Sequence, residues 1–385
     1  MSSSDYAISS APTDLSWNDV ALSSTGQYIY ASAGDSFVYA STDFGSTWTN
    51  MTNGADQQTS GWVVCSSTGQ QVSVLGSESY VYSSADFGLT WTASERDFPG
   101  TTDMASDSTG QFLVLVGGPY FYRSTDYGQT FTEVRMQVNC CTTFITVFSF
   151  ILQTEFSAIS NCRAVASSGS GQYITMVCGT NGNGDVVYTS QNSGSTFANV
   201  AVLENYEFST VTMTSSGQVQ LVGSDFLGGV WISKDFGSTW TTTAASSFLA
   251  YEGIATFGSG TDIALVSMAS VQKSTNYGSY YSLYSMYPVL PNAVGLSSNG
   301  KVMAVVGSNQ GIYITTSMFS SGGGSSSSSS SGSSGLSAGG AAGVSIAVIA
   351  VVLAAVGFVL YKMGYCAAKS AEASKEVPMG AKSAV

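Results

Sequence analysis

The apolar positions of residues 1–319 fall in short runs of five or six residues, separated by turns that contain Gly. In the first unit the predicted strands are 17–24, 28–33, 36–41 and 47–52, with Gly turns at 24–27 and 43–46. Short strands with Gly turns between them are typical of an all-β unit of four strands.

This unit repeats seven times. A marker of the type Ser-Ser-Thr-Gly-Gln recurs with its glycine at Gly26, Gly69, Gly110, Gly171, Gly217, Gly260 and Gly300. The interval is about 43 residues, and one step is about 20 residues longer. Four strands per unit at this period indicate a β-propeller. We therefore predict an all-β, seven-bladed β-propeller over residues 1–319.

The two ends of this region are expected to close the ring. The seventh unit lacks a fourth strand, and the N-terminal segment precedes the first complete unit. Pairing of Tyr6–Ser9 with Ile312–Thr316 removes a free sheet edge that otherwise invites aggregation.

A second marker, an octapeptide, follows the third predicted strand in six units. Four copies are STDFGSTW (Ser41–Trp48), SADFGLTW (Ser84–Trp91), STDYGQTF (Ser124–Phe131) and SKDFGSTW (Ser233–Trp240), and two weaker copies are SQNSGSTF (Ser190–Phe197) and STNYGSYY (Ser274–Tyr281). This pattern resembles the Asp box, the repeat of bacterial neuraminidases and related propellers. The matching positions are Ser41, Asp43, Gly45, Trp48, Ser84, Asp86, Gly88, Trp91, Ser124, Asp126, Gly128, Phe131, Ser190, Asn192, Gly194, Ser233, Asp235, Gly237, Trp240, Ser274, Asn276 and Gly278.

The octapeptide is expected to be structural. Its Ser and Asp have short side chains that bond nearby backbone N–H groups, and its Gly tolerates left-handed geometry. Asn replaces Asp in two copies, which a catalytic carboxylate does not tolerate. The Trp or Phe opens the next strand and packs between blades.

The resemblance implies a fold more firmly than an activity. Sialidases of the family carry an arginine triad, a Tyr/Glu pair, an acid/base Asp and an Arg-Ile-Pro element before the first box. This chain has four arginines, Arg96, Arg123, Arg135 and Arg163, and none precedes Asp43. Sortilin-type receptors and photosystem II assembly factors are similar propellers, but the cysteine-rich module of the former and the basic patches of the latter are missing.

The composition of the chain excludes several kinds of catalytic and binding site. The chain has no His, so Ser-His-Asp catalysis and imidazole ligation are excluded. We expect no metal and no cofactor. Residues 1–320 hold 7 Lys and Arg against 22 Asp and Glu, a net charge of −15 that disfavours nucleic acid. Paired carboxylates remain as an enzymatic alternative, with Asp19, Asp103, Glu207 and Glu252 near the starts of the innermost strands as candidates.

Residues 136–162 interrupt the repeat. This segment is either a hydrophobic loop, closed by a disulfide from Cys140 or Cys141 to Cys162, or untranslated sequence included in the gene model. Cys65 and Cys178 lie in apolar runs and are expected to be small buried hydrophobic residues.

The C-terminal part predicts a membrane anchor. Residues 320–340 form a Ser/Gly-rich stalk, and residues 341–361 carry no charge and are long enough for one transmembrane helix. Lys362 and the net positive tail, 362–385, place the tail in the cytosol and the propeller in an extracellular or lumenal space. Cys366 is a candidate palmitoylation site.

The N-terminus does not fit this topology simply. It has no signal-peptide pattern, so either this sequence lacks the true start or this is a tail-anchored protein with a cytosolic propeller. Asn50 is in the one glycosylation sequon, Asn50–Thr52.

We therefore expect a single-pass membrane protein whose propeller recognises a glycan or a protein partner without catalysis. The alternative is a glycoside hydrolase, sialidase-like or acting on polysaccharides, that uses paired carboxylates.

Overall fold

The computed structural model describes residues 7–8, 10–34, 37–51, 59–76, 78–118, 120–134, 159–180, 185–200, 203, 206–226, 229–246, 249–267, 270–286, 291–308 and 311–316. The chain divides into two compact units, Met1–Ser321 and Gly322–Val385. The predicted stalk, span and tail, with Cys366, lie outside the described residues. Among the described residues, no helix is both long enough and apolar enough to cross a membrane.

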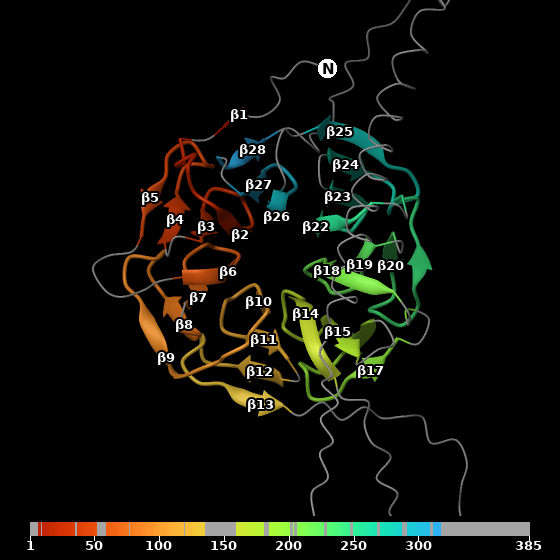
Figure 1. Ribbon diagram of the computed structural model, residues 1–385, viewed down its shortest axis with the longest axis horizontal. Coiled ribbons are helices and arrows are strands. Elements are labelled where there is room, and N and C mark those ends of the chain that lie inside the picture. The colour runs from red at the N-terminus through yellow and green to blue at the C-terminus, as the bar shows by residue number, and fades with distance from the viewer. Residues whose placement is uncertain are drawn as a thin grey trace, which may run out of the picture. The chain divides into compact units, whose positions relative to one another are not determined.

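The first unit is a seven-bladed β-propeller, as the repeat predicts. Seven four-stranded antiparallel sheets surround a central axis (Figure 1). The strands of blades 1 to 4 are β2 (Trp17–Leu22), β3 (Ile29–Ala33), β4 (Phe37–Ser41) and β5 (Thr49–Asn50); β6 (Thr59–Cys65), β7 (Val72–Gly76), β8 (Tyr80–Ser84) and β9 (Thr92–Asp97); β10 (Asp103–Ser106), β11 (Leu113–Gly117), β12 (Tyr120–Ser124) and β13 (Thr132–Val134); and β14 (Ile159–Ser167), β15 (Ile174–Thr180), β16 (Asp185–Ser190) and β17 (Ala198–Asn199).

The remaining blades follow the same order. Their strands are β18 (Glu207–Met213), β19 (Gln220–Phe226), β20 (Val230–Ser233) and β21 (Thr241–Thr242); β22 (Tyr251–Phe257), β23 (Asp262–Ser267), β24 (Ser270–Ser274) and β25 (Ser282–Met286); and β26 (Pro291–Leu296), β27 (Met303–Gly307) and β28 (Tyr313–Thr315), which β1 (Ala7–Ile8) completes. The innermost strands are β2, β6, β10, β14, β18, β22 and β26 (Figure 1).

The ring closes through the N-terminal strand. Ala7 pairs with Ile314 and Ile8 pairs with Tyr313, so β1 supplies the fourth strand that the seventh blade lacks. This confirms the predicted closure, and the free edge of β28 is covered.

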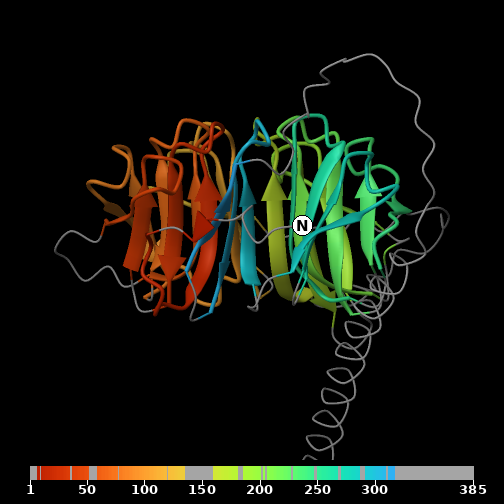
Figure 2. The same cartoon turned by 90° about the horizontal axis from the view of Figure 1, so that it is seen from above.

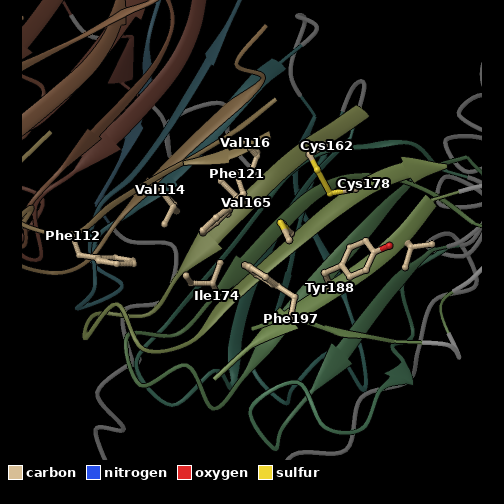
Figure 3. Packing of buried hydrophobic residues seen from close by; sticks show 13 residues of the cluster. Phe112, Val114, Val116, Phe121, Cys162, Val165, Ile174, Cys178, Tyr188 and Phe197 are labelled. Carbon is tan, nitrogen blue, oxygen red and sulfur yellow. A yellow bond between two sulfur atoms is a disulfide. The ribbon is translucent and has the colours of Figure 1, made fainter. Parts of the chain in front are cut away.

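The hydrophobic core lies between adjacent blades. Every residue of the second strands β3, β7, β11 and β27 is buried, because each of these sheets is covered on both faces by its neighbours. Figure 3 shows the cluster between blades 3 and 4, where Phe121 packs edge-on against Phe197 with ring centroids 5.0 Å apart.

The same junction corrects the predicted disulfide. Cys162 and Cys178 lie directly opposite each other in the β14–β15 register and form a disulfide (Figure 3). The predicted bond from Cys140 or Cys141 to Cys162 is therefore wrong, as is the prediction that Cys178 is only a buried hydrophobic residue. Cys140 and Cys141 lie outside the described residues. The last four residues of the predicted insertion belong to β14.

Candidate functional site

Each octapeptide forms a tight turn held by its own Ser and Asp. In the first copy, Phe44 and Gly45 both have positive φ, and the Ser46 N–H donates to the Asp43 carbonyl at 3.2 Å, as in a type I′ turn. Ser41 Oγ accepts the Gly45 N–H at 2.8 Å and donates to Asp43 Oδ1 at 2.9 Å. Asp43 Oδ1 accepts the Thr47 N–H at 2.8 Å. These bonds account for the residue type at each position.

The Asp of this turn acts as a hydrogen-bond acceptor. The Thr47 hydroxyl donates to Asp43 Oδ2 at 2.6 Å, and this bond, with the Thr47 N–H, lowers the pKa of Asp43. Asn192 takes the same role: its Oδ1 accepts the Thr196 N–H at 2.9 Å, and its Nδ2 donates to the Thr196 hydroxyl at 2.8 Å. An amide therefore makes nearly the same turn as a carboxylate.

The six turns lie far from the propeller axis, one in each of blades 1 to 6. The bond from the Ser hydroxyl to the Asp or Asn side chain recurs for Ser84, Ser124, Ser190, Ser233 and Ser274. The indole N–H of Trp48 donates to the Gly45 carbonyl at 3.1 Å, and that of Trp240 donates to the Gly237 carbonyl at 3.0 Å. The octapeptides do not converge on one site.

The turns define two faces of the propeller. The Phe44 N–H donates to the Gln27 carbonyl at 3.1 Å, which joins the octapeptide turn to the β2–β3 turn. Because the strands of a blade run up and down, these two turns share one face, which we call the octapeptide face. The opposite face, where the innermost strands begin, is called the channel-mouth face. Figure 2 shows the blades from the side, with turns at both faces.

A channel of 460 Å³ runs between the innermost strands. Most of its wall is Ala, Val, Leu, Ile, Met, Ser and Thr, and its charged or amide-bearing side chains come from the first residues of the strands. These side chains are Asn18, Asp19, Asp103, Arg163, Glu252 and Asn292. Three of the four acids singled out in the sequence line the channel, and Glu207 does not.

Asp19 and Asp103 join neighbouring blades. Asp19 Oδ1 accepts the Val20 N–H at 2.8 Å, and Oδ2 accepts the Val63 N–H of the next blade at 2.9 Å. Asp103 accepts the Met104 N–H at 2.8 Å and the Val165 N–H of blade 4 at 2.7 Å. Both oxygens of each carboxyl are thus bonded to backbone.

Asp19 and Asp103 are both half-buried in the channel wall. Burial raises the pKa of Asp19 to about 6. Burial, with the charge of Asp19 as a further contribution, raises the pKa of Asp103 to about 8. The backbone N–H bonds act in the opposite direction but do not offset the loss of hydration.

Polar side chains at the strand starts also join blades. The Asn292 amide donates to the Trp17 carbonyl at 2.7 Å across the closure between blades 7 and 1. Ser209 Oγ donates to the Tyr251 carbonyl at 2.9 Å. The Thr102 hydroxyl donates to the carbonyl of Cys162. These donors are an Asn, a Ser and a Thr, so no single residue type in the sequence marks the positions that join blades.

Arg163 and Asp185 form an ion pair at the junction of blades 4 and 5. The Arg163 guanidinium lies 3.2 Å from Asp185 Oδ2, and the same oxygen accepts the Phe208 N–H at 2.7 Å. Asp185 is 2% exposed and Arg163 is 37% exposed, so the guanidinium reaches the channel mouth while its partner is enclosed. The sequence contained no signal that linked these two residues.

The arginines do not form a triad. Arg96 stacks on the rings of Phe98 and Tyr122, at 5.0 and 4.9 Å. Arg123 donates to the Ser193 carbonyl of the next blade at 3.1 Å. Arg135 lies outside the described residues. Within the described part of the chain, no group of three or more Cys, Asp or Glu side chains is arranged to hold a metal ion.

Asn50 lies in the edge strand β5 with its side chain exposed. Thr52, which completes the predicted glycosylation sequon, lies outside the described residues.

Comparisons with known proteins support the fold. No protein-family model matches the sequence, and no curated protein sequence matches it. The solved structure of YCF48 bound to D1 peptide is similar with a TM-score of 0.60 and 15% identity, over 82% of this chain and 98% of that chain. YCF48 from Cyanidioschyzon merolae is similar with a TM-score of 0.61 and 14% identity, over 81% and 98%. At such identity the likeness establishes a shared seven-bladed propeller fold.

Proposed function

We propose that this chain is a membrane-tethered binding protein whose propeller recognises a segment of a protein partner at the channel-mouth face. One observation carries the proposal. Asp19 and Asp103, the paired acids of the channel, already use both carboxyl oxygens to hold the backbone of neighbouring blades. These two acids are thus part of the scaffold, and the mouth carries different polar side chains on different blades.

The make-up of the channel favours a polypeptide ligand over a sugar. Among the described residues that line it, Trp62 is the one aromatic residue, whereas sugar sites use several aromatic faces. A wall of small side chains that presents both polar and apolar groups suits an extended polypeptide segment, which offers backbone N–H and C=O groups along its length. The similar propeller YCF48 is known in a structure bound to D1 peptide, which supports the same class of ligand for this fold.

The glycosidase alternative receives less support. Two catalytic carboxyls need one free to donate a proton and the other free to attack or to activate water. The Oδ2 atoms of this pair accept the backbone N–H groups of Val63 and Val165, so protonation of these oxygens, or a covalent bond at them, weakens the bonds across two blade junctions.

Membrane tethering and an extracellular or lumenal propeller belong to the same proposal. The uncharged run 341–361 and the positive residues after it support the tether and its direction. The disulfide between Cys162 and Cys178 supports an oxidising compartment, because disulfides rarely persist in the cytosol.

The test places the photo-crosslinking residue p-benzoylphenylalanine at Asn18 or at Glu252 in the full chain, in the cells that make it. Leu89, an exposed residue of the octapeptide face, is the control position. We expect polypeptide adducts from the two mouth positions and none from position 89. Adducts at position 89 alone contradict the proposal. Release of sugar from a glycan array by the purified chain, lost in Asp19→Asn, establishes the glycosidase instead.

A further inference from the structure

Large apolar side chains are exposed mainly on one face of the propeller. Among the described residues the exposed ones are Phe44 (45%), Leu89 (57%), Tyr120 (44%), Tyr127 (38%), Tyr280 (67%) and Leu283 (54%). Four of them belong to octapeptides, and Leu283 follows the last octapeptide by two residues. The four octapeptide residues lie on the octapeptide face, Leu283 lies in the edge strand β25 opposite Gln272, and Tyr120, which starts β12, lies near the opposite face.

Phe44 and Tyr127 occupy costly backbone positions. Their φ angles are both 60°, in the left-handed region that bulky residues avoid at a cost of about 1 kcal/mol or more. Gly, Asn or Asp meets this requirement at lower cost. The structure of the turn thus does not explain why aromatic residues stand here.

Packing explains the equivalent aromatic residues of other blades. The ring of Phe87 lies 4.7 Å from that of Tyr28 in the preceding blade. Phe236 stacks on Tyr173, also at 4.7 Å. The described residues place no such ring against Phe44 or Tyr127. These two side chains are available to an outside partner.

The chain leaves the propeller on the same face. Met303 pairs with Thr315 in the seventh blade as Ile29 pairs with Ser41 in the first, so Thr315 takes the place of the first octapeptide residue. In sequence, residues 316–340, mostly Ser and Gly, then lead to the uncharged run 341–361. The 25 residues that lead to the proposed membrane span therefore begin at the face that carries the exposed aromatic residues.

The charges on this face are mixed. The described part of the propeller contains six Lys and Arg residues, and four of them lie at turns of the octapeptide face or beside them: Arg123, Lys234, Lys273 and Lys301. The octapeptide turns also carry the carboxylates Asp43, Asp86, Asp126 and Asp235, so this face has no excess of positive charge. Exposed aromatic side chains are typical of the boundary between lipid headgroups and acyl chains.

We propose that the octapeptide face rests on the membrane surface, with Phe44, Tyr127 and the neighbouring exposed residues inserted at the lipid interface. This inference rests on the proposed membrane tether. It also orients the propeller, because the channel-mouth face then points away from the bilayer, toward a partner. A protein bound to the aromatic residues of the octapeptide face is the competing explanation.

The experiment uses the full chain reconstituted in vesicles of phosphatidylcholine with or without brominated acyl chains. Phe44→Trp and Tyr127→Trp keep an aromatic residue at each position. Tyr120→Trp is the matched control, since Tyr120 has nearly the exposure of Phe44 on the other face. The emission of each added Trp is obtained by difference from the unsubstituted chain, and flotation of the vesicles reports anchoring separately.

We expect all four proteins to float, with brominated lipid removing most of the added emission at positions 44 and 127 and little at position 120. Flotation with no loss at 44 and 127, or with equal loss at all three positions, overturns the docking and leaves the tether intact. Failure of the unsubstituted chain to float overturns the tether and this proposal with it.

Discussion

Asp103 is expected to make the propeller less stable as the pH rises. Burial raises the pKa of its carboxyl from 3.8 to about 8. Between these values the folded state holds the proton and the unfolded state has released it. The free energy of unfolding therefore decreases from about pH 4 to about pH 8 and levels off above that range.

The size of the effect follows from the two pKa values. One pKa unit corresponds to about 1.4 kcal/mol. Between pH 5 and pH 8 the loss through Asp103 is about 4 kcal/mol. Asp19, with a pKa of about 6, adds about 1 kcal/mol, most of it below pH 6.

Asp103→Asn isolates this contribution. The variant does not titrate, so its share of the free energy is constant with pH. Its amide accepts one of the two N–H groups and turns an NH₂ toward the other, which costs about 1 to 3 kcal/mol. The variant should be less stable than the wild type at pH 5 and match or exceed it at pH 8.

Urea unfolding of the chain in detergent, followed by Trp fluorescence at pH 5, 6, 7 and 8 at constant ionic strength, measures this crossing. Asp43→Asn is the control, since the pKa of Asp43 is lowered and its carboxyl stays ionised across the range. Parallel curves for the wild type and Asp103→Asn refute the reasoning, because they mean that Asp103 has the same charge in both states.

Other substitutions test the scaffold by the same unfolding assay. Asp43→Ala should cost about 1 to 2 kcal/mol and Asp43→Asn less than half of that, since an amide keeps most of the turn bonds; equal losses contradict this role. Reduction of the disulfide between Cys162 and Cys178 should cost about 3 kcal/mol, from its separation of 16 residues, and an unchanged midpoint argues against the bond. Gly69 and Gly100 both have a φ of 79°, but a Cβ added at Gly69 would lie 2.6 Å from Tyr28 Cβ, whereas one added at Gly100 would meet no atom. Gly69→Ala should therefore cost at least about 2 kcal/mol more than Gly100→Ala. Similar losses show that the neighbouring blade shifts to make room.

The architecture was predictable because short sequence patterns repeat from blade to blade. All seven blades use the same Gly turn and six use the octapeptide turn, so a period appears in the sequence. Even the closure by β1 followed from a missing strand at one end and a spare one at the other.

Pairings between distant residues were not predictable. The disulfide depends on the register of β14 with β15, and a spacing of cysteines does not reveal a register. Arg163 and Asp185 lie 22 residues apart on different strands, with no pattern to join them. Asp19 and Asp103 were recognisable as channel acids from their blade position, but their backbone partners lie in the next blade.

Recognition by a repeat protein has to come from the positions at which its repeats differ. The Gly turns recur in every blade and the octapeptides in six of the seven, so they do not distinguish one blade from the next. A bound protein segment, in contrast, has an N-terminal and a C-terminal end. In five blades a register shift near the start of the innermost strand inserts one extra residue, and these residues are Asn18, Arg163, Ser209, Glu252 and Asn292. Such bulges re-aim a side chain and are common beside functional sites. They place an arginine, a glutamate and neutral polar groups on different blades of one rim, and that uneven arrangement can give a bound segment both its register and its orientation.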